Sequence, residues 1–233
     1  RNVPRGRTRY PGKIDDVLPH PVSIADCHLF LSALNITGLS DGDEITTWPD
    51  MSAANNDAVG SDAKPYYRTS INGYPAVDFV DAKYLTYTPF TLSTTGSSIF
   101  IIQKVTGDSM LMGHTTNNMQ YRYYYSGNRV YLGFTKVTQF NGSYLEISIN
   151  NWSLIELIRY GSSWFWYQNG KYKGSDGSST SHYTYNTFGK LVTYSDKWQG
   201  YARAIALYNR ALTDDERTSV ESYLLASYGM SWL

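Results

Sequence analysis

The chain has 233 residues, of which 42% are hydrophobic and 17% charged, so it can build a large core and is not intrinsically disordered. It contains a single cysteine, Cys27, which excludes an internal disulfide framework. The formal net charge is zero, but the first thirteen residues hold five basic side chains and no acid: Arg1, Arg5, Arg7, Arg9 and Lys13.

Residues 1–25 are predicted to form an extended basic arm. Four prolines disfavour helix and exclude pairing in a central strand: Pro4, Pro11, Pro19 and Pro21. The arm has three interpretations: a loose terminal tail, a docking segment that orders on an acidic protein partner, or a nucleic-acid contact. The third is the weakest because the rest of the chain is acidic. The docking interpretation assigns partner contacts to Arg5, Arg7, Arg9 and Lys13, and it predicts that deleting residues 1–21 leaves the melting temperature nearly unchanged.

From His28 onward, short apolar runs alternate with turns rich in Gly, Asn, Asp and Ser, which predicts an antiparallel sandwich. Residues 98–105 (SIFIIQKV) are almost continuously apolar, so we expect a central strand that is covered on both faces. Residues 121–134 indicate a hairpin around Ser126-Gly127-Asn128, because these residue types tolerate positive φ.

A second hairpin is predicted from residues 154–160, residues 164–167 and the Asn169-Gly170 turn, with a return strand through Tyr172. Further strands are expected at residues 188–194 and 200–208. A single helix follows, because Thr213-Asp214-Asp215-Glu216 forms a capping box. Apolar residues then recur at helical spacing and Gly229 supplies a C-cap; the apolar positions are Val220, Tyr223, Leu224 and Tyr228.

Residues 200–229 (GYARAIALYNRALTDDERTSVESYLLASYG) resemble the closing strand and helix of laminin G-like, concanavalin A-like domains. The segments WPD at residues 48–50 and GYPAVDF at residues 73–79 agree with the same family, so the match runs over residues 29–229. The resemblance implies an all-β fold over residues 26–233: an antiparallel two-sheet jelly-roll sandwich with one short C-terminal helix. Such a fold does not by itself determine function.

Enzymes with this fold include glucanases and polysaccharide lyases. Retaining glucanases share a Glu-x-Asp-x-x-Glu strand, which sets two carboxylates about 5–5.5 Å apart. The strand glutamates here, Glu146 and Glu156, have no acid two residues away, and the four histidines are scattered. We therefore predict that the chain is not an enzyme and that it has no catalytic residues.

Laminin G-like domains often hold calcium at the rim of the sandwich, so the resemblance implies calcium as a candidate cofactor. The candidate ligands are loop acids: Asp41, Asp43, Asp50 and Asp57. The alternative is that these acids form turns.

Sugar recognition requires flat aromatic platforms beside amides and hydroxyls. The chain is rich in tyrosine, with 22 Tyr against 8 Phe, and we predict weak glycan binding through Tyr183, Tyr185, Tyr123, Trp166 and Asn128. The loop at residues 182–186 is the favoured location. The alternative for each ring is a core position, since half of the aromatic side chains of a strand face inward.

These observations favour a lectin-like display or binding domain on the surface of a bacteriophage virion, anchored by its arm and contacting host or environmental glycans. The alternative is a secreted bacterial carbohydrate-binding or adhesion module, with a glycoside hydrolase or polysaccharide lyase as a weaker third. Both settings are extracellular. No apolar run of 18 residues is present, so no membrane partner is expected.

Overall fold

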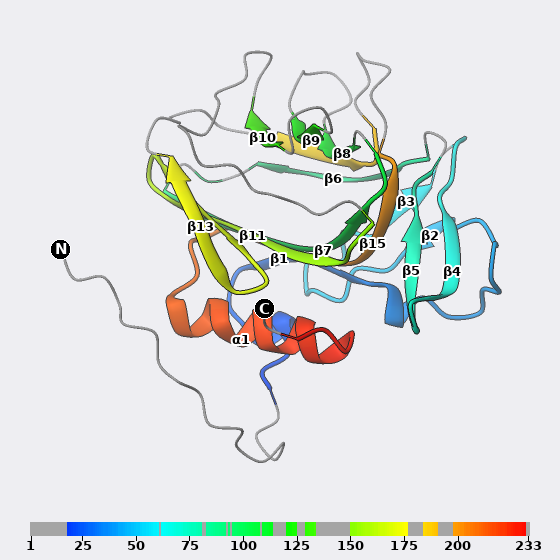
Figure 1. Cartoon of the computed structure of the whole chain (residues 1–233), viewed down its shortest axis with the longest axis horizontal. Coiled ribbons are helices and arrows are strands. Elements are labelled where there is room, and N and C mark those ends of the chain that lie inside the picture. Colours follow the sequence, from blue (N-terminus) through cyan, green and yellow to red (C-terminus); the bar gives the residue numbers. More distant parts are fainter. Residues whose placement is uncertain are drawn as a thin grey trace.

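The computed structural model describes residues 18–60, 62–80, 83–91, 93, 95–107, 109–113, 120–124, 129–133, 150–176, 184–190 and 198–231. For residues 109–111, 120–124, 129–133 and 176 only the backbone is described. In this part of the chain every strand pairing is antiparallel, and the strands form two facing sheets with one helix below them (Figure 1).

The first sheet has the order β13-β12-β11-β7-β15-β5-β4, with β1 also paired to β15. Its strands are β13 Lys171–Asp176, β12 Ser163–Gln168, β11 Ser153–Tyr160, β7 Gly96–Val105, β15 Gly200–Tyr208, β5 Tyr74–Asp78, β4 Tyr66–Ile71 and β1 Cys27–Ser32. The second sheet has the order β10-β9-β8-β14-β6-β3-β2. Its strands are β10 Arg129–Gly133, β9 Gln120–Tyr124, β8 Ser109–Gly113, β14 Thr184–Phe188, β6 Leu85–Thr91, β3 Ala58–Gly60 and β2 Thr47–Trp48. Two short 3-10 turns, η1 Pro21–Ser23 and η2 Ala33–Asn35, flank β1.

Strand β7 is central in the first sheet, and both of its faces are covered. Ile99 and Ile101 belong to the inner core between the sheets, whereas Phe100 and Ile102 belong to an outer core under the helix. Side chains of a strand alternate between faces, so a strand buried on both sides needs an unbroken apolar sequence. The prediction for residues 98–105 is confirmed.

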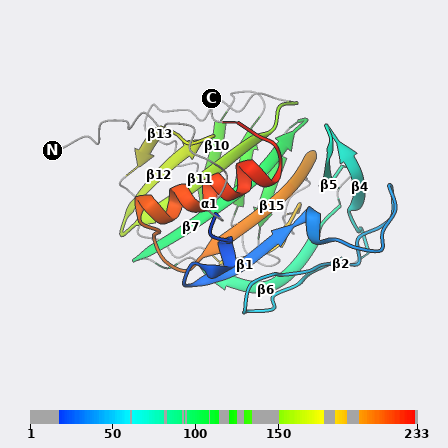
Figure 2. The same cartoon turned by 90° about the horizontal axis from the view of Figure 1, so that it is seen from below.

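Helix α1 (Asp214–Ser227) lies across β11, β7 and β15 on the outer face of the first sheet (Figure 2). Its capping box is complete: Thr213 accepts from the Glu216 backbone N–H, and Glu216 accepts from the Thr213 N–H. Val220 and Leu224 are fully buried against the sheet. Gly229 has a φ of 57°, and a Cβ at this position would overlap the Tyr74 hydroxyl. Among the described residues, no helix is both long and apolar enough to cross a bilayer.

The two predicted hairpins are present. Asn169 and Gly170 take φ values of 47° and 78° between β12 and β13, as a tight hairpin turn requires. Strands β9 and β10 pair over their whole length, while their turn lies outside the described residues. Of the strand expected at residues 188–194, the structure shows that β14 ends at Phe188, and residues 191–194 lie outside the described residues. Residues 184–186, expected in a loop, therefore lie in a strand.

Part of the predicted arm belongs to the sandwich. Pro21 is buried, and its carbonyl accepts a hydrogen bond of 2.9 Å from the Tyr208 hydroxyl. The His20 ring packs against Phe30 and Tyr223, at centroid distances of 5.1 and 4.8 Å. The expectation that the chain is an independent arm as far as residue 25 is therefore corrected for residues 20–24. The basic residues Arg5, Arg7, Arg9 and Lys13 lie outside the described residues.

Candidate functional site

Strand β12 separates its aromatic side chains between two faces of the first sheet. Trp164 and Trp166 point into the inner core and are 2% and 1% exposed. Phe165 and Tyr167 alternate with them and point outward. Phe165 pairs across the sheet with Ile158, which lies in the outer core beside α1.

Four outward-facing rings from three adjacent strands form a continuous surface, which we call the aromatic row: Tyr160, Phe165, Tyr167 and Tyr172. Tyr160 and Phe165 meet edge to face at a centroid distance of 5.6 Å, and Tyr167 and Tyr172 do so at the same distance. Tyr160 is 45% exposed and Tyr172 is 55% exposed. The aromatic row thus exposes two rings next to the helix, Tyr160 on β11 and Tyr172 on β13, while Phe165 and Tyr167 on β12 between them are partly buried.

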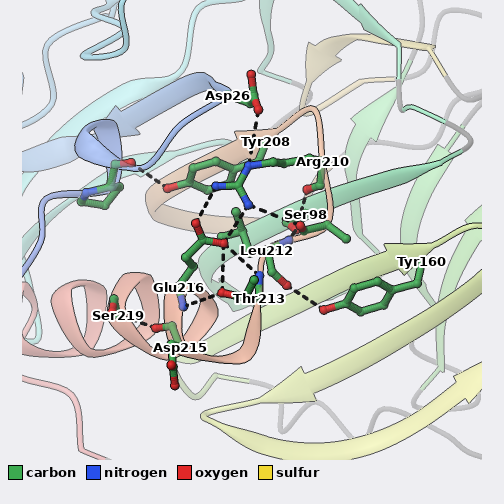
Figure 3. Close-up of polar contacts among 12 residues, drawn as sticks. Asp26, Ser98, Tyr160, Tyr208, Arg210, Leu212, Thr213, Asp215, Glu216 and Ser219 are labelled. Atoms are coloured by element: carbon green, nitrogen blue, oxygen red, sulfur yellow. Dashed lines mark hydrogen bonds and ion pairs between the residues drawn. The ribbon is translucent and has the colours of Figure 1, made fainter.

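The ring of Tyr160 is fixed by a hydrogen bond to the segment that precedes α1 (Figure 3). Its hydroxyl donates to the Leu212 carbonyl at 2.6 Å. That segment is itself held by Ser98, whose hydroxyl donates to the Arg210 carbonyl and accepts from the Leu212 N–H, both at 2.9 Å. Tyr160 can therefore present a ring face to a ligand without losing much side-chain entropy on binding.

The same segment is tied to the helix by an ion pair. Arg210 donates from Nη1 and Nη2 to the two carboxylate oxygens of Glu216, each at 2.7 Å, and its Nε lies 3.4 Å from Asp26 (Figure 3). The Arg210 hydrogen bonds, with backbone donation from Thr213, lower the pKa of Glu216 to about 2. These contacts fix the start of α1 to the segment around Arg210 and Leu212, which holds the Tyr160 hydroxyl.

An exposed acid lies beside the aromatic row. Asp214, in the first turn of α1, has a side chain that is 75% exposed and sits 3.9 Å from Arg217. Burial is the main cause that raises the pKa of Tyr160 and of Tyr167, and the charge of Asp214 adds to it in both cases. The Asp214 carboxylate is close enough to both rings to affect their pKa values, and it can accept hydrogen bonds from a molecule lying on the aromatic row.

At the helix side of the row, Arg217 joins the helix to the sheet. Its guanidinium carbon lies 4.1 Å from the centre of the Tyr167 ring. Its Nη1 contacts Glu156 at 2.8 Å and Glu221 at 3.1 Å, and both of these carboxylate side chains are essentially inaccessible to solvent. Burial raises the pKa of Glu156 to about 7, although the charge of Arg217 opposes the shift.

Two of the residues predicted from the sequence to bind sugar lie in the core of the sandwich. Tyr185 and Trp166 are 0% and 1% exposed in the inner core, so their assignment is corrected. Tyr123 lies in β9, of which only the backbone is described, and Tyr183 and Asn128 lie outside the described residues. The sequence Trp-Phe-Trp-Tyr at residues 164–167 could have shown that only alternate rings face outward, since successive side chains of a strand point to opposite faces.

Two of the predicted calcium ligands organise a loop. Asp50 is buried and accepts four hydrogen bonds of 2.7–2.9 Å, from the N–H groups of Phe30, Ser52 and Asn56 and from the Ser52 hydroxyl. Asp57 accepts from the Asp50 N–H at 2.8 Å. Asp50 is therefore saturated by donors that a cation would have to displace.

The other two predicted ligands are also engaged. Asp41 accepts from the Thr69 N–H at 2.9 Å and lies 3.8 Å from Arg68, and Asp43 accepts from the Ser40 N–H at 2.7 Å. Within the described ranges, no three His, Cys, Asp or Glu side chains converge in a way that could hold a metal ion. Calcium binding at these loop acids stays a prediction.

A shallow groove with a volume of about 240 Å³ lies at the other end of the sandwich, near β2. Its lining mixes one carboxylate and one amide with hydroxyls and apolar groups: Asn35, Ile36, Thr37, Leu39, Glu44, Thr46, Thr47 and Pro49. Figure 1 places β2 and β13 on opposite sides of the molecule, so the groove and the aromatic row are separate surfaces. The groove has no aromatic platform.

A scan against protein-family models gives no match for this sequence, and a search of curated proteins gives none either. Solved structures do match. Domain 4 of AbnA, a GH43 extracellular arabinanase from Geobacillus stearothermophilus, in complex with arabinotriose, is 14% identical with a TM-score of 0.59, and the match covers 84% of this chain and 98% of that one.

Two larger proteins match over part of their length. An arabinofuranosidase complexed with arabinofuranosyl-alpha-1,2-xylobiose is 10% identical with a TM-score of 0.62, and the match covers 79% of this chain and 51% of that one. Trypanosoma rangeli sialidase in complex with the inhibitor DANA is 11% identical with a TM-score of 0.57, with coverages of 86% and 33%. The chain thus spans about half and about a third of these two proteins, and the matches establish a shared β-sandwich fold.

These matches correct the prediction that the chain is not an enzyme. The proteins that share its fold include an arabinanase, an arabinofuranosidase and a sialidase, all of which are carbohydrate-active. The missing Glu-x-Asp-x-x-Glu strand therefore does not exclude an enzymatic role. None of the three is a virion or adhesion protein, so those expectations gain no support here.

Proposed function

We propose that this chain is a glycan-binding β-sandwich domain that acts outside the cell as part of a carbohydrate-active protein. The observation that carries the proposal is the aromatic row, in which the exposed rings of Tyr160 and Tyr172 are each paired with a ring of β12 and lie near an exposed carboxylate. A concanavalin A-like ancestry, as the sequence resemblance implies, is consistent with this role.

The chemistry of a sugar explains why this surface suits it. A pyranose or furanose ring offers C–H groups that pack on an aromatic face and hydroxyls at its edge that need hydrogen-bond partners. Tyr160 and Tyr172 offer roughly half of their surface to such stacking, and Asp214 offers acceptor oxygens at the side of the row. The platform is shallow, which favours an internal stretch of a polysaccharide over a small enclosed ligand.

The matched structures support the class of ligand. The arabinanase domain was solved with arabinotriose and the arabinofuranosidase with an arabinofuranosyl xylobiose, so arabinose-containing polysaccharides are the first to test. Display on a virion is the weaker setting, because it rests on the basic residues near the start of the sequence alone.

Affinity electrophoresis and calorimetry against arabinan, arabinoxylan, cellulose and sialylated glycans would test the proposal. Tyr172→Ala and Phe165→Ala should each weaken binding about tenfold or more, which corresponds to about 1.4 kcal/mol of lost stacking. Tyr172→Phe keeps the ring and should bind as the wild type does. Met51→Ala, an exposed apolar side chain away from the row, is the matched control.

Failure of every polysaccharide to bind would overturn the proposed function. Binding that survives both alanine substitutions would move the site elsewhere, and Thr46→Trp would then test the groove near β2. The same panel should be assayed for released reducing ends, because the proteins with this fold include hydrolases and the assay shows whether this chain carries such activity itself.

A further inference from the structure

Arg217 is in contact with the aromatic row on one side and with two buried carboxylates on the other. Its guanidinium lies over the Tyr167 ring at 4.1 Å, a distance at which a cation is attracted to the ring face. The same group donates to Glu156 at 2.8 Å and to Glu221 at 3.1 Å. A change in the charge of either carboxylate therefore acts on the group that holds Tyr167.

The two carboxylates that contact Arg217 lie on different elements, one on the helix and one on the sheet. Glu221 lies on α1, four residues after Arg217, and Asp214 is on the same helix. Glu156 lies on β11, where it pairs with Tyr167 of β12 across the sheet. Among the ion pairs of Arg217 in the described ranges, the one with Glu156 alone connects the helix to the sheet.

Among the described residues, the charged and titratable groups that face Glu156 belong to this cluster. Helix α1 contributes Arg217 and Glu221, with Asp214 reaching Arg217 from the helix start, and β12 contributes Tyr167. Strand β7 places Phe100 opposite Glu156, and this side chain does not titrate. Two carboxylates thus share one guanidinium at a site without solvent, a setting in which one carboxylate takes up a proton more readily than usual.

We propose that Glu156 acts as a positioning residue for the aromatic row and makes it responsive to pH. Ionised Glu156 holds the Arg217 guanidinium on Tyr167 and ties the helix to the sheet. A protonated Glu156 no longer attracts the guanidinium, which keeps its contacts with the acids of its own helix and loses its fixed place on the ring. As a modulation of glycan affinity, the effect rests on the function proposed above, whereas the coupling between Glu156 and Tyr167 does not.

The coupling can be tested on the ligand-free chain. The aromatic ring resonances of Tyr167, assigned by NMR, should shift with pH through a transition near neutrality that coincides with the titration of the Glu156 side-chain carboxyl carbon. Glu156→Gln should abolish the transition of Tyr167, and Glu44→Gln, at an exposed acid far from the helix, should leave it unchanged. The carboxyl titration of the wild type needs no variant and keeps the test decisive if Glu156→Gln does not fold.

Glycan affinity gives the second readout. Wild-type binding should weaken several-fold as the pH falls through the same transition, and Glu156→Gln should bind weakly with a flat pH profile. A Tyr167 signal that does not follow the titration of Glu156 would overturn the proposal, whatever the chain binds. A Tyr167 signal that does follow it, in a chain that binds no glycan, would support the coupling and refute the proposed function alone.

Discussion

Trp166 and Tyr167 are neighbours in the chain but lie on opposite faces of one sheet. Trp166 is 1% exposed in the core between the two sheets, whereas the Tyr167 ring lies under the guanidinium of Arg217 on the outer face. The position of an aromatic residue in β12 thus decides whether it contributes to stability or to an accessible surface.

This division predicts effects of very different size on stability for two substitutions. Trp166→Ala removes a fully buried ring and should lower the free energy of unfolding by about 3–5 kcal/mol. Tyr172→Ala removes a ring that is 55% exposed and should change it by less than about 1 kcal/mol. Chemical denaturation of both variants checks the contrast. Equal losses would show that the outward face is as tightly packed as the core.

The buried pair of Glu156 and Arg217 predicts a stability that depends on pH. Because the folded pKa of Glu156 is raised to about 7 from an ordinary 4.5, its contribution to stability is full below 4.5 and is lost as the pH rises through 7. From about pH 5 to about pH 8, the melting temperature of Glu156→Gln should therefore rise relative to that of the wild type. Differential scanning calorimetry measures the difference.

The ion pair at the start of α1 predicts the opposite sign. The folded pKa of Glu216 is lowered to about 2, so its contribution is present above 4.5 and is lost as the pH falls towards 2. The Glu216 side chain is 33% exposed, which limits the contribution to about 1 kcal/mol. Glu216→Gln should shift the midpoint of acid unfolding, followed by circular dichroism, to higher pH. Arg210→Lys keeps the charge, loses the two parallel hydrogen bonds and should shift it in the same direction.

Residues 20–24 predict where truncation becomes harmful. A chain that starts at residue 25 loses the buried Pro21 and Ile24, and it leaves the Tyr208 hydroxyl without its acceptor, at a cost of about 1–3 kcal/mol for the hydroxyl alone. Its melting temperature should lie several degrees below that of a chain that starts at Leu18. Identical melting temperatures would mean that this segment adds nothing to the sandwich.

Much of the fold could be predicted from local sequence patterns. The capping box at Thr213, the Asn169-Gly170 turn and the apolar run of β7 each act over a few residues, and each is present in the structure. The candidate site could not be predicted in the same way. The face that Tyr167 occupies depends on which side of the sheet α1 covers, and the contact between Glu156 and Arg217 joins residues 61 positions apart.

The pairing of β1 with β15 sets the order in which the first sheet can be completed during protein synthesis. Residues 29–32 find their partners at residues 204–207, so a ribosome must produce most of the chain before β1 can be enclosed. Until then Leu29, Phe30 and Leu31 remain open to other chains, and long-range pairing of this kind is slow. Strand β1 is therefore expected to stay unpaired until residues 204–207 have been synthesised, and to benefit from a chaperone that shields it.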